Sequence, residues 1–286
     1  MAVCCSASVR LSRPVRGVAK KRAHPAILIP AMPLQFQPMP LLKRAAPFDD
    51  PDWIYELKMD GFRALAVIEN GRTQLFSRNG HPFASFSALA ESISDSLPNV
   101  RAVIDGEICS VDRHGRPQFK NLMFRRGNPP CFFAFDLLTC DGKDLRTERL
   151  LDRKQELRRL LARSPDSPLK YTEYIDGCGT ALFQRVCELD LEGIVAKQKS
   201  APYVTEREHS TWFKILNRAY SQREGREKLG AFRDGCKAFL SDLKAEEPRF
   251  EKAVERAQEL LWWGIGSMMS DEEVDAHLAA RRTKQQ

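Results

Sequence analysis

The residue of this sequence best suited to act as a nucleophile is Lys58, which lies in a short polar turn. The turn, Lys-Met-Asp-Gly-Phe-Arg at residues 58–63, separates two strand-like apolar runs. A lysine attacks an electrophile only as the free amine, and with an ordinary pKa of about 10.4 roughly one in 10³ is neutral at pH 7. A second cation or a metal close by would raise that fraction, and Lys197 and Lys214 are candidates for such a cation.

Two other residues of the turn suit a phosphate or sugar ligand. Gly61 is expected to let the backbone approach a ligand closely, and Arg63 to bind phosphate or ribose oxygens. Taken alone, the turn is equally typical of a β-turn whose charged side chains are solvated. The rest of the chain must decide between a site and a solvated turn.

Two strand-like segments carry carboxylates suited to the same chemistry. Asp105 and Glu107 share one face of a strand, so one of them could bind a ribose hydroxyl or a hydrated divalent cation, although a charged strand edge gives the same pattern. Glu192 and Lys197 bracket a short apolar strand and fall on opposite faces of an ideal one. A bend at Gly193 or at the strand end is needed for them to converge.

Aromatic rings and a lysine among apolar neighbours complete the inventory. Phe133 and Phe135 fall on one face of a strand, where they could be core residues or a shelf for a purine ring. Lys214 lies in Trp-Phe-Lys-Ile at residues 212–215. A lysine in such surroundings is costly without an anionic partner, which favours a functional role.

The charge of this 286-residue chain is unevenly distributed. The net charge is +7, but residues 1–44 hold eight Lys or Arg and no Asp or Glu, so the remainder sums to −1. Binding of nucleic acid by the folded part therefore requires a local basic patch, to which a basic arm could add affinity that does not depend on sequence.

Cysteine usage and hydropathy indicate in which cellular compartment the protein works. The eight cysteines include no Cys-x-x-Cys pair and no zinc-finger spacing, which is typical of a reducing compartment such as the cytoplasm. No apolar run approaches the 18 residues of a membrane span, so no membrane partner is expected. The first 22 residues resemble an organelle transit peptide, but we prefer a disordered basic arm.

The hydrophobic pattern predicts an α+β domain built largely of antiparallel sheets. Strands are predicted at residues 53–55, 64–69, 73–77, 102–111, 131–138, 169–174, 192–196 and 211–216. Helices are predicted at residues 85–97, 147–163 (with a strongly basic face) and 178–189. Helices inserted among hairpins, without strict alternation, favour this class. Three parts follow: a disordered arm (1–30), the domain (31–218) and a helical extension (219–286) containing Trp262 and Trp263.

The ordered motifs between Lys58 and Lys214 resemble those of the covalent nucleotidyltransferases. The closest resemblance is to the ATP-dependent DNA ligase family, in particular the short ligases and ligase modules of bacterial end joining. It covers roughly residues 38–218 and is strongest at residues 47–58, 77–80 and 134–138. The fold that the resemblance implies is a nucleotidyltransferase (adenylation) domain.

The resemblance implies roles at the reacting phosphate. Lys58 would attack the α-phosphate of ATP, form lysyl-AMP and release pyrophosphate. Lys197 and Lys214 would neutralise the α-phosphate during transfer. Arg78 would face the 5′-phosphate of the nick or the phosphate of AMP.

For the nucleoside and the metal, the resemblance implies further residues. Glu56 would bind the amino group of adenine, and Phe135 would stack on its ring. Arg63 and Glu107 would hold the ribose. Glu192, together with Glu107, would bind the divalent cation, Mg²⁺ or Mn²⁺.

The chain departs from the family pattern at two places. The last motif normally carries two lysines one residue apart, but Leu216 stands at the second position. Residues 219–286 show helical periodicity instead of the short strands of the OB-fold domain that follows in full-length ligases. Both departures put efficient self-adenylylation in question.

Three functions are consistent with these residues. The leading hypothesis is a DNA ligase-type adenylyltransferase that seals nicked or broken double-stranded DNA in repair, in the bacterial cytoplasm near the nucleoid, with a repair partner supplying a DNA clamp. The second is an RNA ligase or a capping-type nucleotidyltransferase. The third, which Leu216 and the basic arm favour, is a non-catalytic factor that binds DNA ends or nicks.

Overall fold

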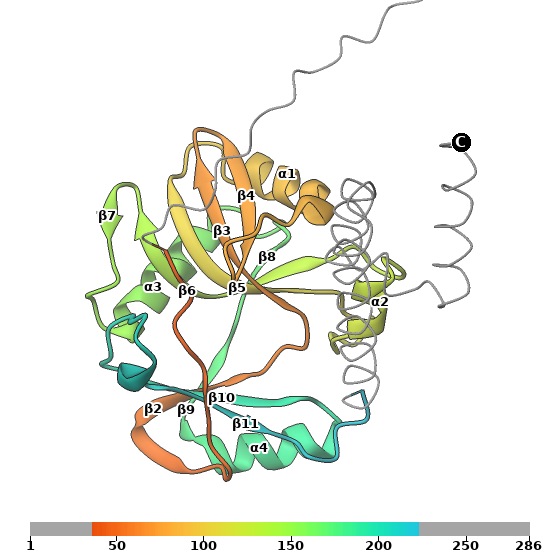
Figure 1. Cartoon of the computed structure of the whole chain (residues 1–286), viewed down its shortest axis with the longest axis vertical. Coiled ribbons are helices and arrows are strands. Elements are labelled where there is room, and N and C mark those ends of the chain that lie inside the picture. The colour runs from red at the N-terminus through yellow and green to blue at the C-terminus, as the bar shows by residue number, and fades with distance from the viewer. Residues whose placement is uncertain (1–35, 223–286) are drawn as a thin grey trace, which may run out of the picture. The chain divides into compact units, whose positions relative to one another are not determined.

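The computed structural model of this protein describes residues 36–222 of the chain. Within that range two β-sheets and the helices that flank them form an α+β domain, which confirms the expected fold class (Figure 1). The predicted arm at residues 1–30, and the extension beyond residue 222 with Trp262 and Trp263, lie outside the described residues.

The first sheet brings together strands that are far apart in the sequence. Its order is β1-β11-β10-β2-β9, and all of its pairs are antiparallel except β1 with β11. Its strands are β1 (Leu42–Lys43), β2 (Asp49–Leu57), β9 (Tyr174–Cys178), β10 (Gly193–Gln198) and β11 (Trp212–Leu216). Strand β2 begins before the strand predicted at residues 53–55, because Asp49 already pairs with Cys178, and the register shifts between Asp49 and Ile54.

The strands of the second sheet pair antiparallel, except for β8. Its order is β4-β3-β5-β6-β7, with β8 pairing in parallel with β6. Its strands are β3 (Phe62–Glu69), β4 (Arg72–Ser77), β5 (Ala102–Cys109), β6 (Cys131–Cys140), β7 (Lys143–Asp144) and β8 (Leu169–Tyr171). The strand predicted at residues 169–174 is thus divided: the chain leaves β8 at Thr172 and enters β9 in the other sheet.

The helices cover the sheets from outside. They are α1 (Ser87–Ser96), α2 (Phe119–Met123), α3 (Leu150–Leu161) and α4 (Gly179–Glu188), with 3₁₀ turns at Ala84–Phe86 and Arg207–His209. The three predicted helices are confirmed with shorter ends, and α2 was not predicted. In the described part of the chain no helix is long and apolar enough to cross a membrane.

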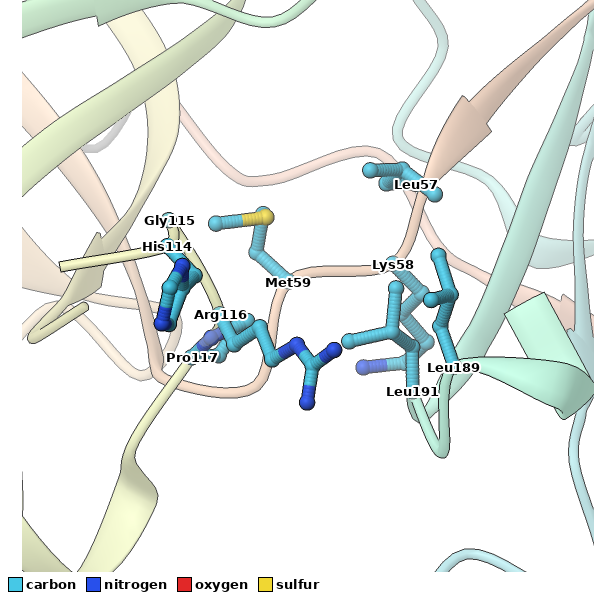
Figure 2. A pocket seen from close by; sticks show the side chains of 9 residues that line it. All are labelled: Leu57, Lys58, Met59, His114, Gly115, Arg116, Pro117, Leu189 and Leu191. Carbon is cyan, nitrogen blue, oxygen red and sulfur yellow. The ribbon is translucent and has the colours of Figure 1, made fainter. Parts of the chain in front are cut away.

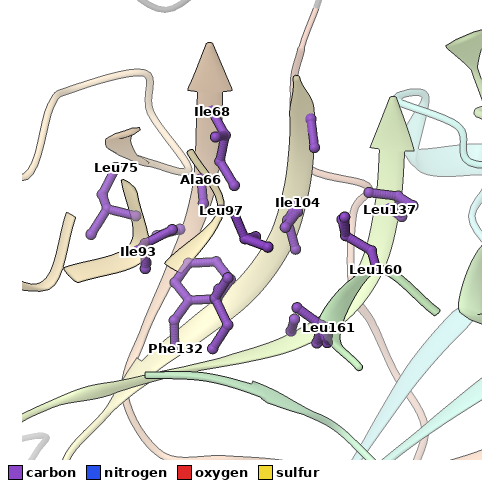
Figure 3. Close-up of a cluster of buried hydrophobic side chains, with 14 of the residues drawn as sticks. Ala66, Ile68, Leu75, Ile93, Leu97, Ile104, Phe132, Leu137, Leu160 and Leu161 are labelled. Atoms are coloured by element: carbon purple, nitrogen blue, oxygen red, sulfur yellow. The ribbon is translucent and has the colours of Figure 1, made fainter. Parts of the chain in front are cut away.

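The largest hydrophobic cluster lies between the second sheet and helices α1 and α3 (Figure 3). Alternate residues of β3, such as Ala66 and Ile68, point into it together with Ile93 of α1 and Leu160 of α3. Because side chains alternate across a strand, the intervening residues of β3, β5 and β6 face the other way, toward the first sheet. That inner face carries the polar residues singled out above.

A second cluster fills part of the space between the two sheets. Ile54 of β2, Leu65 of β3, Val103 of β5 and Trp212 of β11 meet there, each almost completely buried. Helix α4 packs on the outer face of the first sheet, against Tyr55 and its neighbours. The first sheet is therefore apolar on its outer face and mixed on its inner face.

The predicted basic face of the helix at residues 147–163 is only partly exposed. Arg153 and Lys154 are buried in the same stripe as Leu150, Leu157 and Leu161. The spacing of these five residues is that of one helix face, so the pattern itself placed both cations in the core. Each of the two is paired with a buried carboxylate, as described below.

The chain keeps contact with the domain beyond residue 218. Tyr220 is buried and donates a hydrogen bond to Asp60 of the lysine turn, at 2.9 Å. Ser221 bonds to Asp190 through its backbone N–H, at 2.9 Å, and through its hydroxyl. The chain therefore continues to pack on the domain up to the end of the described residues.

Candidate active site

Lys58 lies at the end of β2 and faces a carboxylate from a distant part of the chain. Its Nζ is 2.8 Å from Oε2 of Glu192, and both side chains are mostly buried. The backbone N–H of Lys58 also donates to the carbonyl of Gly193, at 3.0 Å. The lysine turn and the start of β10 therefore lie side by side, and Glu192 contacts Lys58 while Lys197 contacts Glu56.

Glycine is required at two positions around this contact. At Gly193, which has a φ of +155°, a Cβ would lie 2.2 Å from the carbonyl oxygen of Ile215, so only glycine fits at the start of β10, next to Glu192. At Gly61 a Cβ would lie 2.1 Å from the carbonyl oxygen of Ile108. Strand β5 therefore approaches the backbone closely at Gly61.

Lys214 and Arg78 form a cationic surrounding for Lys58. Lys214 is partly buried on β11; burial lowers its pKa, and the charge of Lys58 lowers it further, while Glu192 opposes the shift. Arg78 is exposed and contributes to the same lowering. Leu216, at the position of the missing lysine, pairs with Gly193 at the start of β10.

A small cavity between the two sheets joins most of the predicted site residues. It is lined by Glu56, Lys58, Arg63, Glu107, Phe135 and Lys197, together with Thr172, Val195, Trp212 and three residues of its rim, Leu41, Leu57 and Met59. The cavity encloses about 50 Å³. Sites for small-molecule ligands usually measure roughly 300–1,000 Å³, so a nucleotide requires this one to open.

Lys197 is the side chain that fills the cavity. Its Nζ lies 3.9 Å from the centre of the Trp212 ring, 4.3 Å from the centre of the Phe135 ring and 2.6 Å from Oε2 of Glu56. Burial lowers the pKa of Lys197 to about 8, although Glu56 opposes the shift. The amine expected to neutralise a phosphate is therefore engaged with Glu56 in this structure.

We expect the substitution Lys197→Met to stabilise the protein at pH 7. The pKa of about 8, against an ordinary 10.5, means that the folded state binds a proton less readily than the unfolded state. The charged lysine therefore lowers the free energy of unfolding below pH 8, by up to about 3 kcal/mol, and this penalty fades as the pH rises to 10.5. Denaturant unfolding of both proteins at pH 7 and pH 10 measures the difference. Equal stability at pH 7 would contradict this account.

Glu56 is held between two buried amines, one of which the sequence analysis missed. Oε1 of Glu56 is 2.5 Å from Nζ of Lys154, and Oε2 faces Lys197. Lys154 comes from α3, where its place in the apolar stripe with Leu150 and Leu157 was the signal that could have revealed it. With an amine partner on each oxygen, the carboxylate of Glu56 is fixed in orientation.

Arg63 is fixed by a second network on the inner face. Its guanidinium makes two hydrogen bonds to Asp105, at 2.7 and 3.1 Å, and a third to the carbonyl of Met39, at 2.8 Å. Asp105 also accepts a hydrogen bond from the hydroxyl of Tyr203, at 2.7 Å. Glu107 stands opposite Arg63 in the pairing of β3 with β5. Of the two strand carboxylates, Asp105 therefore orients Arg63, and Glu107 lines the cavity.

Thr172 is a further residue of the cavity that the sequence did not indicate. It is buried, and its hydroxyl oxygen has no hydrogen-bond partner among the described residues. A buried hydroxyl without a partner costs about 1–3 kcal/mol, which is unusual unless a ligand supplies the partner. Thr172 lies at the crossover between the two sheets, which sequence periodicity could not locate.

A second, larger cavity of about 420 Å³ reaches Lys58 from another side. Figure 2 shows Lys58 beside Leu189 and Leu191, while Arg116 extends toward them from the loop that follows β5. Lys58 lines both cavities, together with its neighbours Leu57 and Met59.

The donor set beside Lys58 suits a hydrated magnesium ion. No group of three or more His, Cys, Asp or Glu side chains converges on a metal position within residues 36–222. Mg²⁺ usually takes only one or two protein carboxylates, because water and substrate phosphates complete its octahedral shell. Glu192 beside Lys58, and Glu107 on the cavity wall, meet that requirement.

Comparison with known proteins places this arrangement in a family. A family described as "ATP dependent DNA ligase domain" matches residues 41–215. The multifunctional non-homologous end joining protein LigD of Pseudomonas aeruginosa is 33% identical over 168 residues, 57% of this chain and 20% of that protein. The bifunctional LigD of Bacillus subtilis is 30% identical over 210 residues, 64% of this chain and 34% of that protein.

A solved structure agrees with the sequence matches. The structure described as "mycobacterial DNA ligase D complexed with ATP and MES" superposes with a TM-score of 0.54 and 30% identity, over 63% of this chain and 60% of that one. The present chain spans a fifth to about a third of the length of the two LigD proteins. Because the family match covers more than half of the sequence, the chain belongs to the ATP-dependent DNA ligase domain family.

Proposed function

We propose that this chain is a DNA ligase-type adenylyltransferase that forms lysyl-AMP on Lys58 and seals strand breaks in DNA repair. The observation that carries the proposal is the position of Lys58: its amine lies beside Glu192 and at the edge of a cavity lined by Glu56, Phe135 and Glu107. The names of the relatives, which are end-joining proteins and ligases, support the same reaction.

The reaction proceeds in three displacements at phosphorus. The ammonium of Lys58 gives one proton to water, and the free amine attacks the α-phosphate of ATP; an N–P bond forms, the bond to pyrophosphate breaks, pyrophosphate leaves, and the nitrogen gives a second proton to water. An oxygen of a DNA 5′-phosphate then displaces the amine, which regains a proton, and AMP is joined to the DNA. The neighbouring 3′-OH finally attacks that 5′-phosphate, loses its proton and releases AMP. Positioning and charge supply most of the catalysis of such steps.

The residues of the site divide into two groups in this reaction. Before the first step, the amine of Lys58 gives up a proton and separates from Glu192. Lys214 and Arg78 then counter the negative charge that develops on the phosphate.

The second group binds the nucleoside. Phe135 stacks on the adenine ring, and Glu56 accepts a hydrogen bond from its amino group. Arg63 and Glu107 hold the ribose. Lys197 must leave its place between Phe135 and Trp212 for the ring to enter. In its new position it can assist the phosphate, as expected from the sequence.

A divalent cation, Mg²⁺ or Mn²⁺, completes the proposed site. Glu192 and Glu107 would hold it together with the phosphates of ATP. When bound, such an ion neutralises charge on the phosphate oxygens.

Labelling with ATP tests the proposal. Incubation of the protein with Mg²⁺ and ATP labelled at the α-phosphate is expected to give a labelled protein, and pre-adenylylated nicked DNA is expected to be sealed. Absence of both activities from folded protein would refute the proposal.

The third hypothesis, a factor that binds nicks without catalysis, has two observations in its favour. The cavity measures only about 50 Å³, and Leu216 stands where the family pattern normally has a second lysine. Salt-dependent binding of nicked DNA that persists without AMP transfer would support it. Comparison of DNA with RNA nicks, and of ATP with GTP, tests the RNA ligase and capping alternatives.

We expect the substitution Thr172→Val to weaken ATP binding and to leave folding intact. Valine has nearly the shape of threonine, but lacks the hydroxyl that we propose contacts the nucleotide. Loss of one hydrogen bond is worth about 1 kcal/mol, so the Kd for ATP should rise roughly fivefold. Removal of an unpaired buried hydroxyl should leave the melting temperature equal or higher. Isothermal titration with ATP measures the effect; an unchanged Kd would contradict the assignment.

The substrate and the setting follow from the same reasoning. We propose nicked or broken double-stranded DNA as substrate, and a repair partner protein that supplies the DNA clamp. The free cysteines Cys109, Cys131, Cys140, Cys178 and Cys187 support a reducing location, the bacterial cytoplasm near the nucleoid.

A further inference from the structure

Lys154 is a buried lysine whose ammonium has all three of its hydrogens engaged. Its Nζ is 2.5 Å from Oε1 of Glu56, 3.2 Å from the carbonyl oxygen of Thr172 and 3.4 Å from that of Phe135. The side chain is only 1% exposed, and its amine also lies 4.7 Å from the centre of the Tyr171 ring. An ammonium has three donors and no acceptor, so this environment matches it completely.

The three acceptors of Lys154 all belong to the nucleotide cavity, although Lys154 itself does not line it. Glu56, Thr172 and Phe135 come from β2, from the crossover between the sheets and from β6. Lys154, from α3, joins these three elements at one point behind the cavity. Its charge is buried, which would be costly if its purpose were only to pack the helix.

Glu56 is consequently held from two sides by amines of different accessibility. Lys197 contacts Oε2 from within the cavity, whereas Lys154 contacts Oε1 from behind. When a base enters and Lys197 moves, Lys154 remains the partner of the carboxylate. The carboxylate of Glu56 therefore keeps one cationic partner and its orientation, and its oxygens accept hydrogen bonds.

We propose that Lys154 is the positioning residue that makes Glu56 select adenine over guanine. This inference rests on the proposed function, in which Glu56 faces the base. Adenine presents an amino group, a donor, at the 6-position, while guanine presents a carbonyl oxygen, an acceptor, at the same place. A carboxylate that is held in place accepts a hydrogen bond from the first and repels the second. Without Lys154, Oε1 of Glu56 loses the contact that holds it, and the carboxylate can rotate so that it no longer opposes the carbonyl oxygen of guanine.

The test measures nucleotide preference in the full-length protein. Rates of self-labelling with α-labelled ATP and GTP, with Mg²⁺, give kcat/KM for each nucleotide. The wild type should prefer ATP by at least about a hundredfold, and Lys154→Met should reduce that preference by at least about tenfold. Lys170→Met, the same change at a partly exposed lysine outside the cavity, should leave the preference unchanged.

A double-mutant cycle separates positioning from a general structural effect. If Lys154 acts through Glu56, then Lys154→Met should not alter the ATP-to-GTP ratio further in a Glu56→Gln background. If Lys154→Met does not melt cooperatively, Lys154→Gln, which keeps a neutral donor of similar reach, takes its place. An unchanged ratio in folded Lys154→Met, or in folded Lys154→Gln where it takes that variant's place, would overturn the inference.

The outcomes also distinguish this inference from the proposed function. Absence of labelling of the wild type by either nucleotide would contradict the proposed function itself. A labelled wild type that uses GTP as well as ATP would contradict only the role of Lys154, whatever the variants do.

Discussion

The substitution Lys58→Ala is expected to abolish formation of lysyl-AMP, a loss of more than about a thousandfold. No other amine takes its place. Lys197 is paired with Glu56. Burial lowers the pKa of Lys214, which favours its free amine, but Lys214 lies on β11 and not in the turn. Lys58→Arg keeps the cation and can keep the contact with Glu192, but a guanidinium stays protonated and cannot attack. Neither variant has a free amine at residue 58, so both should fail in the first step.

The same variants should keep the last step of sealing. The 3′-OH attacks the 5′-phosphate of adenylylated DNA, and this step forms no bond to Lys58. Sealing of a pre-adenylylated nick by Lys58→Ala should remain within about tenfold of the wild type. Gel assays of both steps, with Lys170→Ala as control, measure the separation. Equal loss of both steps would mean that Lys58 supports folding or DNA binding and is not the nucleophile.

The substitution Asp136→Asn should destabilise the domain by about 3–5 kcal/mol. Asp136 and Arg153 are both completely buried and are joined by two hydrogen bonds of 2.8 Å. Arg153 also donates to the carbonyl oxygens of Glu148 and Ala201, at 2.7 and 3.0 Å, and so anchors the start of α3. Asparagine would leave the guanidinium charge buried without a counter-charge.

A matched surface pair provides the control. Arg146 and Asp144 make the same kind of contact, with an N–O distance of 2.6 Å, but both are partly exposed to solvent. Asp144→Asn should cost less than about 1 kcal/mol. Replacing both buried partners, Asp136→Leu with Arg153→Met, should recover much of the stability, because no charge is then left unpaired. Chemical denaturation measures all three, and equal costs for Asp136→Asn and Asp144→Asn would contradict this account.

The strands and helices were largely predictable because their patterns are local. The alternation in β5 correctly placed Asp105 and Glu107 on one face, whereas Glu192 and Lys197 pair with Lys58 and Glu56 instead of with each other. Family resemblance then identified residues that meet in space, such as Lys58 and Glu192, which lie 134 positions apart.

What the sequence could not supply is the set of contacts that depend on tertiary packing. The crossover at Thr172, the burial of Lys154 behind Glu56 and the insertion of Lys197 between two rings each join different elements. A charged residue on a helix is usually solvated, so burial of Lys154 was recognisable only from its spacing with the leucines of α3. The small volume of the cavity, about 50 Å³, likewise depends on where the side chains lie.

Peptide mapping of the wild-type protein after reaction with α-labelled ATP and Mg²⁺ tests the central claim most directly. The account predicts one acid-labile AMP group, on the peptide that contains Lys58, which disappears when nicked DNA is added. An AMP group on a peptide containing Lys197 or Lys214 instead, or folded protein that binds nicked DNA and carries no AMP, would contradict it.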